Sequence, residues 1–291
     1  TIEKVIPEGN HTRRAGEDLQ AGQVVFKKGG LLTPTHLGVL ASIGCTEVSI
    51  FPPLKVGVVS TGDELVEGEV PLQPGQIRDS NRHSLLALLN DLGLEGVDLG
   101  LIPDEEEAIE EVFRSACSGE SRCDVVISSG GVSMGDFDFV KVVLDRLGDM
   151  RWMQVAIKPA KPLAFGLVEN VPVFGLPGNP VSSIVSFELF VRPALRKMMG
   201  HTDIWSSKIK AVAESPISRR PDEKTHFARV KVSLADGGYK VQSAGGQGSH
   251  QLSAMAEANA LAVLPDGNGV ESGDVVEIIL LHQLTRDLNA S

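Results

Sequence analysis

From Lys55 to about residue 203 the chain alternates short apolar runs with amphipathic segments, and this alternation constrains the fold more than any other sequence feature. The apolar runs are bounded by glycine, proline or polar residues, which is typical of strands. Nearly continuous apolar strands joined by helices indicate a parallel sheet covered on both faces. We therefore predict an α/β domain with a doubly wound, mostly parallel sheet. Its expected strands are Val56–Ser60, Val97–Ile102, Val125–Ser129, Trp152–Ile157, Leu163–Val168 and Val173–Leu176.

Helix boundaries between these strands are marked by capping residues. Asp104 precedes Glu107 by three residues, which resembles a capping box. Proline directly after Asn179 favours a helix start at that point, and the apolar residues that follow predict a buried helix. Helices are expected over 80–92, from Asp104, from near Asp136 to Gly148, and from Asn179 onward.

The segments on either side of this domain have different patterns. Residues 1–50 contain turns, a β-like run over Gln23–Lys27 and a helix with Thr33 as N-cap, and they read as part of an N-terminal, β-rich domain. After residue 206, apolar runs separated by Gly, Asp and Asn turns predict an all-β domain. We assign residues 1–50, 51–203 and 204–291 to these three parts. The C-terminal strands are expected at Lys208–Ala213, Phe227–Leu234, Tyr239–Ser243, Leu261–Leu264 and Val275–Leu281.

Composition narrows the class of function. The net charge of −11 argues against nonspecific nucleic-acid binding, which needs a basic face. Apolar runs are too short to span a bilayer, so no membrane partner is expected. The three cysteines, Cys45, Cys117 and Cys123, form no CxxC pair, which favours inert thiols in a reducing cytoplasm. The histidines do not fall at metal-ligand spacing, so no zinc site is expected.

The residues directly after the strands indicate a ligand site, because open α/β sheets bind ligands beyond the carboxyl ends of their strands. Small and acidic residues follow the first strand, over 60–64, and Asp104 follows the second. The third strand leads through Gly130 and Gly131 into a helix start, where free N–H groups attract phosphate. The carboxylates of Asp63, Glu64, Asp104 and Asp138 would repel phosphate unless Mg²⁺ intervened.

Cations are expected from the Lys158-Pro159-Ala160-Lys161-Pro162 loop, in which proline prevents helix formation. Each feature also has a purely structural explanation. A Gly-Gly turn is often a tight connection, the loop can be a solvated one, and Asp104 or Asp136 can be a helix cap. His226 and His250 fit structural or surface roles. We favour a metal-assisted anion site because these features converge on one edge of one sheet.

Five motifs then resemble the molybdopterin molybdenumtransferases, a family that includes bacterial molybdenum insertases, the plant insertase E domain and the E domain of gephyrin. The similarity extends from residues 13–18 to the C-terminal domain and implies the molybdopterin-binding fold. The motifs are STGDEL (60–65), PGQIRDSN (74–81), DVVISSGGVSMGDFDF (124–139), IKPAKPLAFG (157–166) and LPGNPVS (176–182).

The resemblance implies a reaction in which adenylylated molybdopterin and molybdate bind, the phosphoanhydride is hydrolysed with Mg²⁺ present, and molybdenum enters the dithiolene with release of AMP. It also implies a homodimer and a molybdopterin adenylyltransferase as possible partner. The implied catalytic residues are Asp18, Glu64, Asp104, Asp138 and Lys158, with Asp104 and Asp138 as metal ligands. The implied substrate-binding residues are Ser60, Thr61, Gly62, Asp63, Ser129, Gly130, Gly131, Ser133, Gly135, Lys161, Pro177, Pro180, Arg229 and Ser249.

Two departures from the family pattern affect these expectations. Gln154 stands where relatives often carry Lys or Arg, so one positive contact is expected to be missing. Relatives also have a preceding region with an aspartate in a Met-Asp-Gly-type motif, so this chain is expected to dimerise poorly or turn over slowly without it. Two alternatives stay open: a gephyrin-like peptide-binding scaffold, and molybdopterin adenylyltransferase, which shares the SSGGVSMG-type core but uses a single α/β domain.

Overall fold

The computed structural model describes residues 5, 7–120, 122–132, 139–235 and 237–281. It divides the chain into two compact units, one formed by residues 1–50 with 200–202 and the other by residues 51–199 with 203–291. None of the described helices is long and apolar enough to cross a membrane.

The first unit contains helix α1 (Pro34–Ser42), which begins where predicted. Thr33 is its N-cap, the Thr33 N–H donates to Nδ1 of His36 at 3.0 Å, and Pro34 occupies the first turn. The predicted β run over Gln23–Lys27 is wrong, since its residues are irregular and the described part of this unit contains no strand. A single extended run without a neighbouring strand cannot form the ladder that stabilises it.

The second unit is built on a six-stranded sheet with the order β4-β1-β5-β9-β8-β6. Strands β4, β1, β5 and β9 are mutually parallel, whereas β8 runs antiparallel to both of its neighbours. The doubly wound, mostly parallel sheet is therefore confirmed. Its strands are β1 (Lys55–Thr61), β4 (Glu95–Ile102), β5 (Val125–Ser129), β6 (Gly148–Gln154), β8 (Pro162–Val168) and β9 (Val171–Leu176).

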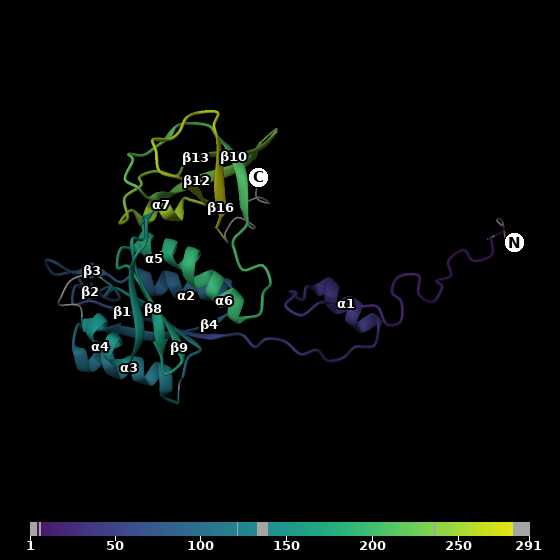
Figure 1. The fold of residues 1–291 in the computed structure, drawn as a ribbon, viewed down its shortest axis with the longest axis horizontal. Coiled ribbons are helices and arrows are strands. Elements are labelled where there is room, and N and C mark those ends of the chain that lie inside the picture. Colours follow the sequence, from purple (N-terminus) through teal and green to yellow (C-terminus); the bar gives the residue numbers. More distant parts are fainter. Residues whose placement is uncertain (1–4, 6, 121, 133–138, 236, 282–291) are drawn as a thin grey trace. The chain divides into compact units, whose positions relative to one another are not determined.

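Helices cover both faces of this sheet (Figure 1). Side chains of β1 alternate between two hydrophobic clusters, with Val56 and Val58 in one and Val59 in the other. This alternation requires apolar residues at successive positions, and it explains why the strands were recognisable as continuous apolar runs. The first cluster includes α2 (Asn81–Asp91), the π-helix η1 (Phe187–Val191) and α6 (Arg192–Met198); the second includes α3 (Glu106–Ser118) and α4 (Phe139–Leu147).

Two helix starts differ from the prediction. Glu105, not Asp104, is the N-cap of α3, so the predicted capping box does not form. Instead, the Asp104 backbone N–H donates to Oδ1 of Asp63 at 3.0 Å, which ties the ends of β4 and β1 together. The start of the third helix near Asp136 lies outside the described residues.

The final helix begins after Asn179 as predicted, but it changes geometry along its length. It continues from α5 (Pro180–Ser186) into η1 and then α6. Pro193 in the first turn of α6 has no N–H to donate to the preceding turn, which accounts for the wider π-helical turn before it. Buried Arg192 forms two hydrogen bonds to the buried carboxylate of Glu188, at 2.6 and 2.7 Å.

The C-terminal part is a closed β-barrel with one short helix, α7 (Leu252–Ala256), which confirms the predicted β domain. The strand order β13-β10-β16-β14-β12 closes because β13 also pairs with β12. One strand from the α/β part, β7 (Ile157–Lys158), pairs in parallel with β12. The barrel strands are β10 (Lys208–Ala213), β12 (Thr225–Ala235), β13 (Gly238–Ser243), β14 (Ala260–Leu264) and β16 (Val275–Leu280). Two short pairs, β2 (Leu65–Val66) with β3 (Ile77–Arg78) and β11 (Ile217–Ser218) with β15 (Gly269–Val270), complete the fold.

Candidate functional site

A pocket of ≈ 770 Å³ lies at the carboxyl edge of the six-stranded sheet. The ends of β1, β5, β6 and β9 contribute to it, and the beginning of β8 returns to the same edge because it pairs antiparallel with β6. Among the residues that the sequence predicted for the site, those that line this pocket are Thr61, Gly62, Glu64, Asp104, Ser129, Gly130, Gly131, Lys161 and Pro177.

The other predicted residues lie elsewhere. Ser60 is buried and its hydroxyl donates to Asp79, while Asp63 accepts the Asp104 N–H. Pro180 opens α5, and Asp18 belongs to the first unit. Lys158 pairs with the barrel strand β12, which contains Arg229, and Ser249 precedes the barrel helix α7. Ser133, Gly135 and Asp138 lie outside the described residues.

At Gly130 the ends of β5 and β1 lie close together. A Cβ atom at this position would lie 2.7 Å from the Thr61 carbonyl oxygen, and the residue has a φ of +98°. Both conditions favour glycine, because L side chains rarely adopt this backbone conformation and no side-chain atom fits against that oxygen. The Gly-Gly turn is thus a close contact between the ends of β5 and β1 as well as part of the pocket lining.

Asn81, at the start of α2, is a pocket residue that the sequence reasoning missed. Its Nδ2 donates to Oγ of Ser129 at 2.8 Å and to the carbonyl oxygen of Gly178 at 2.7 Å. The Asn81 backbone N–H donates in turn to Oδ1 of buried Asp79 at 3.1 Å. Asp79 also accepts hydrogen bonds from Ser60 and from Arg82. Asp79 and Asn81 of the PGQIRDSN motif therefore hold together the carboxyl ends of β1, β5 and β9.

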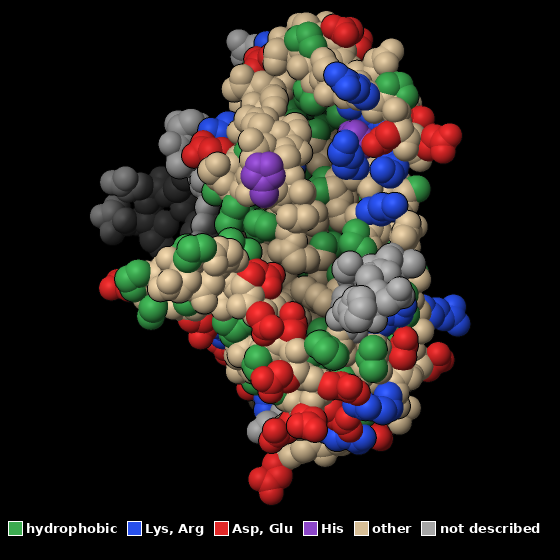
Figure 2. All heavy atoms as spheres, turned by 90° about the vertical axis from the view of Figure 1, so that its left-hand side faces the viewer, with side chains coloured by type: hydrophobic (Ala, Val, Ile, Leu, Met, Phe, Trp, Pro, Cys, Tyr) green, Lys and Arg blue, Asp and Glu red, His purple; other side chains and the backbone are tan. Residues whose placement is uncertain are grey.

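The described lining of the pocket carries more negative than positive charge. Glu64 and Asp104 supply carboxylates, and Lys161 is the cation among the described lining residues. Gln154 also lines the pocket and contributes no charge to it. The described residues contain no group of three or more metal-binding side chains. Figure 2 shows acidic side chains gathered over the lower part of one face and several lysine and arginine side chains over its upper part.

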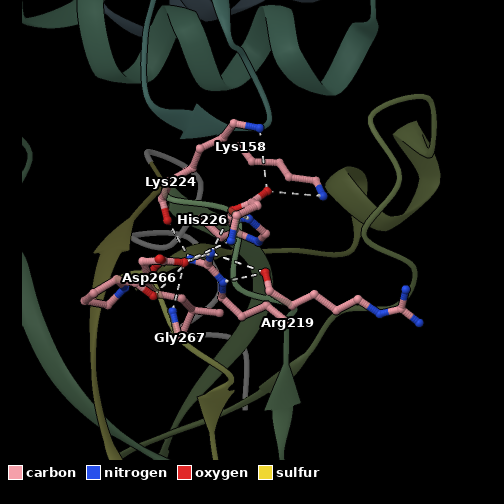
Figure 3. A network of polar contacts seen from close by, with 10 residues as sticks. Lys158, Arg219, Lys224, His226, Asp266 and Gly267 are labelled. Carbon is pink, nitrogen blue, oxygen red and sulfur yellow. Dashed lines mark hydrogen bonds and ion pairs between the residues drawn. The ribbon is translucent and has the colours of Figure 1, made fainter.

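Lys158 lies on β7, where it pairs with His226 of the barrel strand β12. Its Nζ is 3.8 Å from Oδ2 of Asp222, and Oδ1 of the same carboxylate accepts a hydrogen bond from Nε2 of His226 at 2.9 Å (Figure 3). Arg219 donates to Asp222 at 2.8 Å and to Asp266 at 2.7 Å, and it thereby fixes this network. Burial lowers the pKa of His226 below its usual value, although the bond to Asp222 opposes this shift. The Lys158 side chain stays 59% exposed.

Arg229 is a fully buried cation with unused donors. Its Nη2 donates to the carbonyl oxygens of Gly246 and Gly248, at 2.7 and 3.2 Å. Its Nε and Nη1 have no hydrogen-bond partner in the described part of the chain, and burial lowers the pKa of its guanidinium. A buried guanidinium with free N–H groups is suited to bind an oxyanion. The adjacent Ser249 carbonyl accepts the Val181 N–H at 3.1 Å, so this loop is bonded to the first turn of α5.

Comparison with known proteins gives a consistent result along the chain. Residues 57–197 match the family described as a probable molybdopterin binding domain. Residues 1–44 match the MoeA N-terminal region (domain I and II), and residues 210–281 match the MoeA C-terminal region (domain IV).

Relatives at the level of whole sequences and structures agree with these matches. A molybdopterin molybdenumtransferase from Haemophilus influenzae is 44% identical over 94% of this chain and 68% of its own length. The molybdopterin molybdenumtransferase 2 of Mycobacterium tuberculosis is 38% identical over 95% of this chain and 66% of its own length. The crystal structure of a molybdopterin biosynthesis MoeA protein from Pyrococcus horikoshii superposes with a TM-score of 0.73 at 30% identity, covering 90% of this chain and 63% of that one. The chain thus spans about two thirds of the length of these relatives, and it belongs to the molybdopterin molybdenumtransferase family.

Proposed function

We propose that this chain carries out the transferase reaction of its family in molybdenum cofactor biosynthesis. In this reaction molybdenum from molybdate is inserted into adenylylated molybdopterin, the phosphoanhydride is cleaved and AMP is released. The observation that carries the proposal is the pocket at the carboxyl edge of the sheet, whose lining combines the Gly130-Gly131 turn with Glu64, Asp104 and Lys161.

The phosphate groups of the substrate would lie against the turn after β5, where glycines allow the backbone to approach an anion. Mg²⁺ would be held by Asp104 together with Asp138, which lies outside the described residues, and it would neutralise charge on the phosphate oxygens. The chemistry of the pocket fits this ion, because Glu64 and Asp104 supply the hard oxygen ligands that Mg²⁺ prefers. The same carboxylates would repel an anionic substrate in the absence of a cation.

Molybdate would bind to the cations Lys161, Lys158 and Arg229, with Ser133 and Ser249 as hydroxyl donors. Two observations support this set. Arg229 is buried with unused N–H donors, and Lys158 is held 3.8 Å from one carboxylate while its side chain stays largely exposed. A tetrahedral dianion would satisfy donors that the described residues of the protein leave unpaired.

Calorimetric titration with molybdate, with and without AMP and Mg²⁺, tests the proposal. Because a hydrogen bond to a charged group contributes about 1.5–3 kcal/mol, Lys161→Ala is expected to weaken molybdate binding by roughly 10- to 100-fold. Lys208→Ala is the matched control, since this lysine is similarly charged but forms an ion pair with Glu277 on the barrel. Equal affinities of the two variants, or no molybdate binding by the unsubstituted chain, would argue against the proposal.

The matches outside the molybdopterin-binding domain support insertion rather than adenylyl transfer, which needs only the α/β domain. An ATP-dependent adenylylation assay with molybdopterin would distinguish the two reactions. We also infer a homodimer, a cytoplasmic location and an adenylyltransferase partner. These inferences rest on the family resemblance and, for the location, on cysteines that are all free thiols.

A further inference from the structure

We propose that Asn81 is a positioning residue that fixes the direction of the Ser129 hydroxyl, so that this hydroxyl donates its hydrogen to an anionic oxygen of the ligand. The inference rests on the proposed function for the presence of a phosphate-bearing ligand in the pocket. It goes further by giving a polar residue at the start of α2 a specific effect on how that ligand is bound.

The orientation of the Asn81 amide follows from its partners. The side-chain nitrogen is 2.7 Å from the Gly178 carbonyl oxygen, and a carbonyl oxygen can only accept a hydrogen bond. The atom that faces Gly178 must therefore be the nitrogen, because a flipped amide would place two acceptors against each other. The second hydrogen of the same nitrogen points to Oγ of Ser129 at 2.8 Å. Both hydrogens of the Asn81 side chain are thus used.

The direction of the Ser129 hydroxyl follows in turn. A hydroxyl has one hydrogen to donate and two lone pairs to accept, and here one lone pair takes the Asn81 hydrogen bond. The hydroxyl hydrogen must point away from Asn81, and no described residue accepts it. Ser129 is only 2% exposed, yet it lines the pocket. A buried hydroxyl hydrogen that faces a pocket is directed at the ligand, and an oxygen of a phosphate group is the acceptor that best fits it.

The support behind Asn81 keeps this arrangement rigid before the ligand arrives. The Asn81 backbone N–H is bonded to Asp79, whose carboxylate is buried together with the side chain of Arg82. Ser129 is the last residue of β5 and Gly178 lies just after β9, so the Asn81 amide joins two strand ends that are far apart in the sequence but line one pocket. Preorganised donors bind a charged group more tightly than donors that must first be ordered.

A double-mutant cycle measured by AMP titration in excess Mg²⁺ tests the inference. Asn81→Ala is expected to raise the Kd for AMP about tenfold, since the hydroxyl then becomes free to rotate. In a Ser129→Ala background the same substitution is expected to change the Kd by less than about twofold, because no hydroxyl remains to be oriented. Asn90→Ala is the matched control, since it removes an exposed asparagine from the other end of the same helix.

A spectroscopic readout separates orientation from a general structural role. In ¹H–¹⁵N spectra of asparagine-labelled chain, both side-chain hydrogens of Asn81 are expected downfield of those of exposed asparagines. Ser129→Ala is expected to return one of the two to the exposed range and to leave the other, bonded to Gly178, in place. Side-chain signals at exposed positions in the unsubstituted chain would overturn the inference.

The outcomes also distinguish this inference from the proposed function. If AMP binds and Asn81→Ala weakens it equally in both backgrounds, the positioning role is wrong while the proposed function stands. If the unsubstituted chain binds neither AMP nor molybdate, both are overturned. A reduced effect in the Ser129→Ala background, together with the expected shift of one amide hydrogen, would support the inference.

Discussion

Gly130 allows a sharp quantitative test of how the pocket is built. In Gly130→Ala the new Cβ would lie 2.7 Å from the Thr61 carbonyl oxygen, well inside ordinary van der Waals contact, at a backbone φ of +98°. The positive φ costs an L residue about 1–2 kcal/mol. Separating the ends of β1 and β5 to make room costs about 1–3 kcal/mol, as in other overpacked sites. Alanine also restricts the unfolded chain more than glycine does, and this stabilises the folded state by about 0.4–1 kcal/mol.

The expected net loss of stability is therefore about 1–4.5 kcal/mol. With a urea dependence of about 2 kcal/mol per molar, the midpoint of unfolding falls by about 0.5–2 M. Urea unfolding is best followed by tryptophan fluorescence in a Trp205→Phe background, so that Trp152 in β6 reports on the α/β sheet. Gly178→Ala is the matched control in the same pocket, since its Cβ would meet its nearest neighbour at 3.9 Å. Equal midpoints for the two variants would refute the steric argument.

Three further outcomes follow from buried charged or titratable groups. Arg192→Met leaves the Glu188 carboxylate buried and unpaired, so the free energy of unfolding in urea should fall by about 3–5 kcal/mol. Adding Glu188→Leu should recover most of this loss. A smaller loss in the single variant than in the double variant would contradict the expectation. Burial lowers the pKa of His226 below its usual value of 6.5, so near this pH the folded chain binds fewer protons than the unfolded chain. The free energy of unfolding should therefore fall as the pH drops through about 6.5. An NMR titration midpoint of His226 above 6.5 would show that the sign is wrong. Burial raises the pKa of Cys117 to about 11, so Cys45 should react with a thiol reagent at pH 8 long before Cys117 does, as peptide mapping would show.

Much of the α/β domain was predictable because its chemistry is local. Val125–Ser129 matches β5 at both ends, since burial on both faces requires an unbroken apolar run. Thr33 and Pro34 marked the start of α1 because capping depends on adjacent residues. Strand direction, in contrast, could not be predicted from the local sequence. The apolar runs of β6 and β8 carry no sign of their antiparallel pairing, which depends on the connection and on the neighbouring strands.

The pocket was predictable to the extent that strand ends supply its residues. Glu64, Asp104 and Lys161 were found by their places after strands, and all three line the pocket. Asn81 closes the PGQIRDSN motif but was not predicted as a site residue. Its two side-chain bonds reach residues 48 and 97 positions away, and no local pattern reveals such contacts. Asp104, predicted as a metal-binding residue, was also expected to begin a capping box. Its backbone bond to Asp63 spans 41 residues, a contact that no local pattern reveals.

The pairing of β7 with β12 has a consequence for dissecting the protein into fragments. Residues 157–158 belong to the α/β part by sequence, yet they pair with Thr225 and His226 of the barrel. A barrel expressed from residue 204 onward would present that stretch of β12 as an unpaired edge, which promotes self-association. Conversely, proteolytic cleavage between α6 and β10 would leave the two pieces joined by backbone hydrogen bonds and by the buried cluster that Ile157 shares with Leu261 and Val181. The two halves should therefore behave as complementing fragments, folding better when mixed than when kept apart.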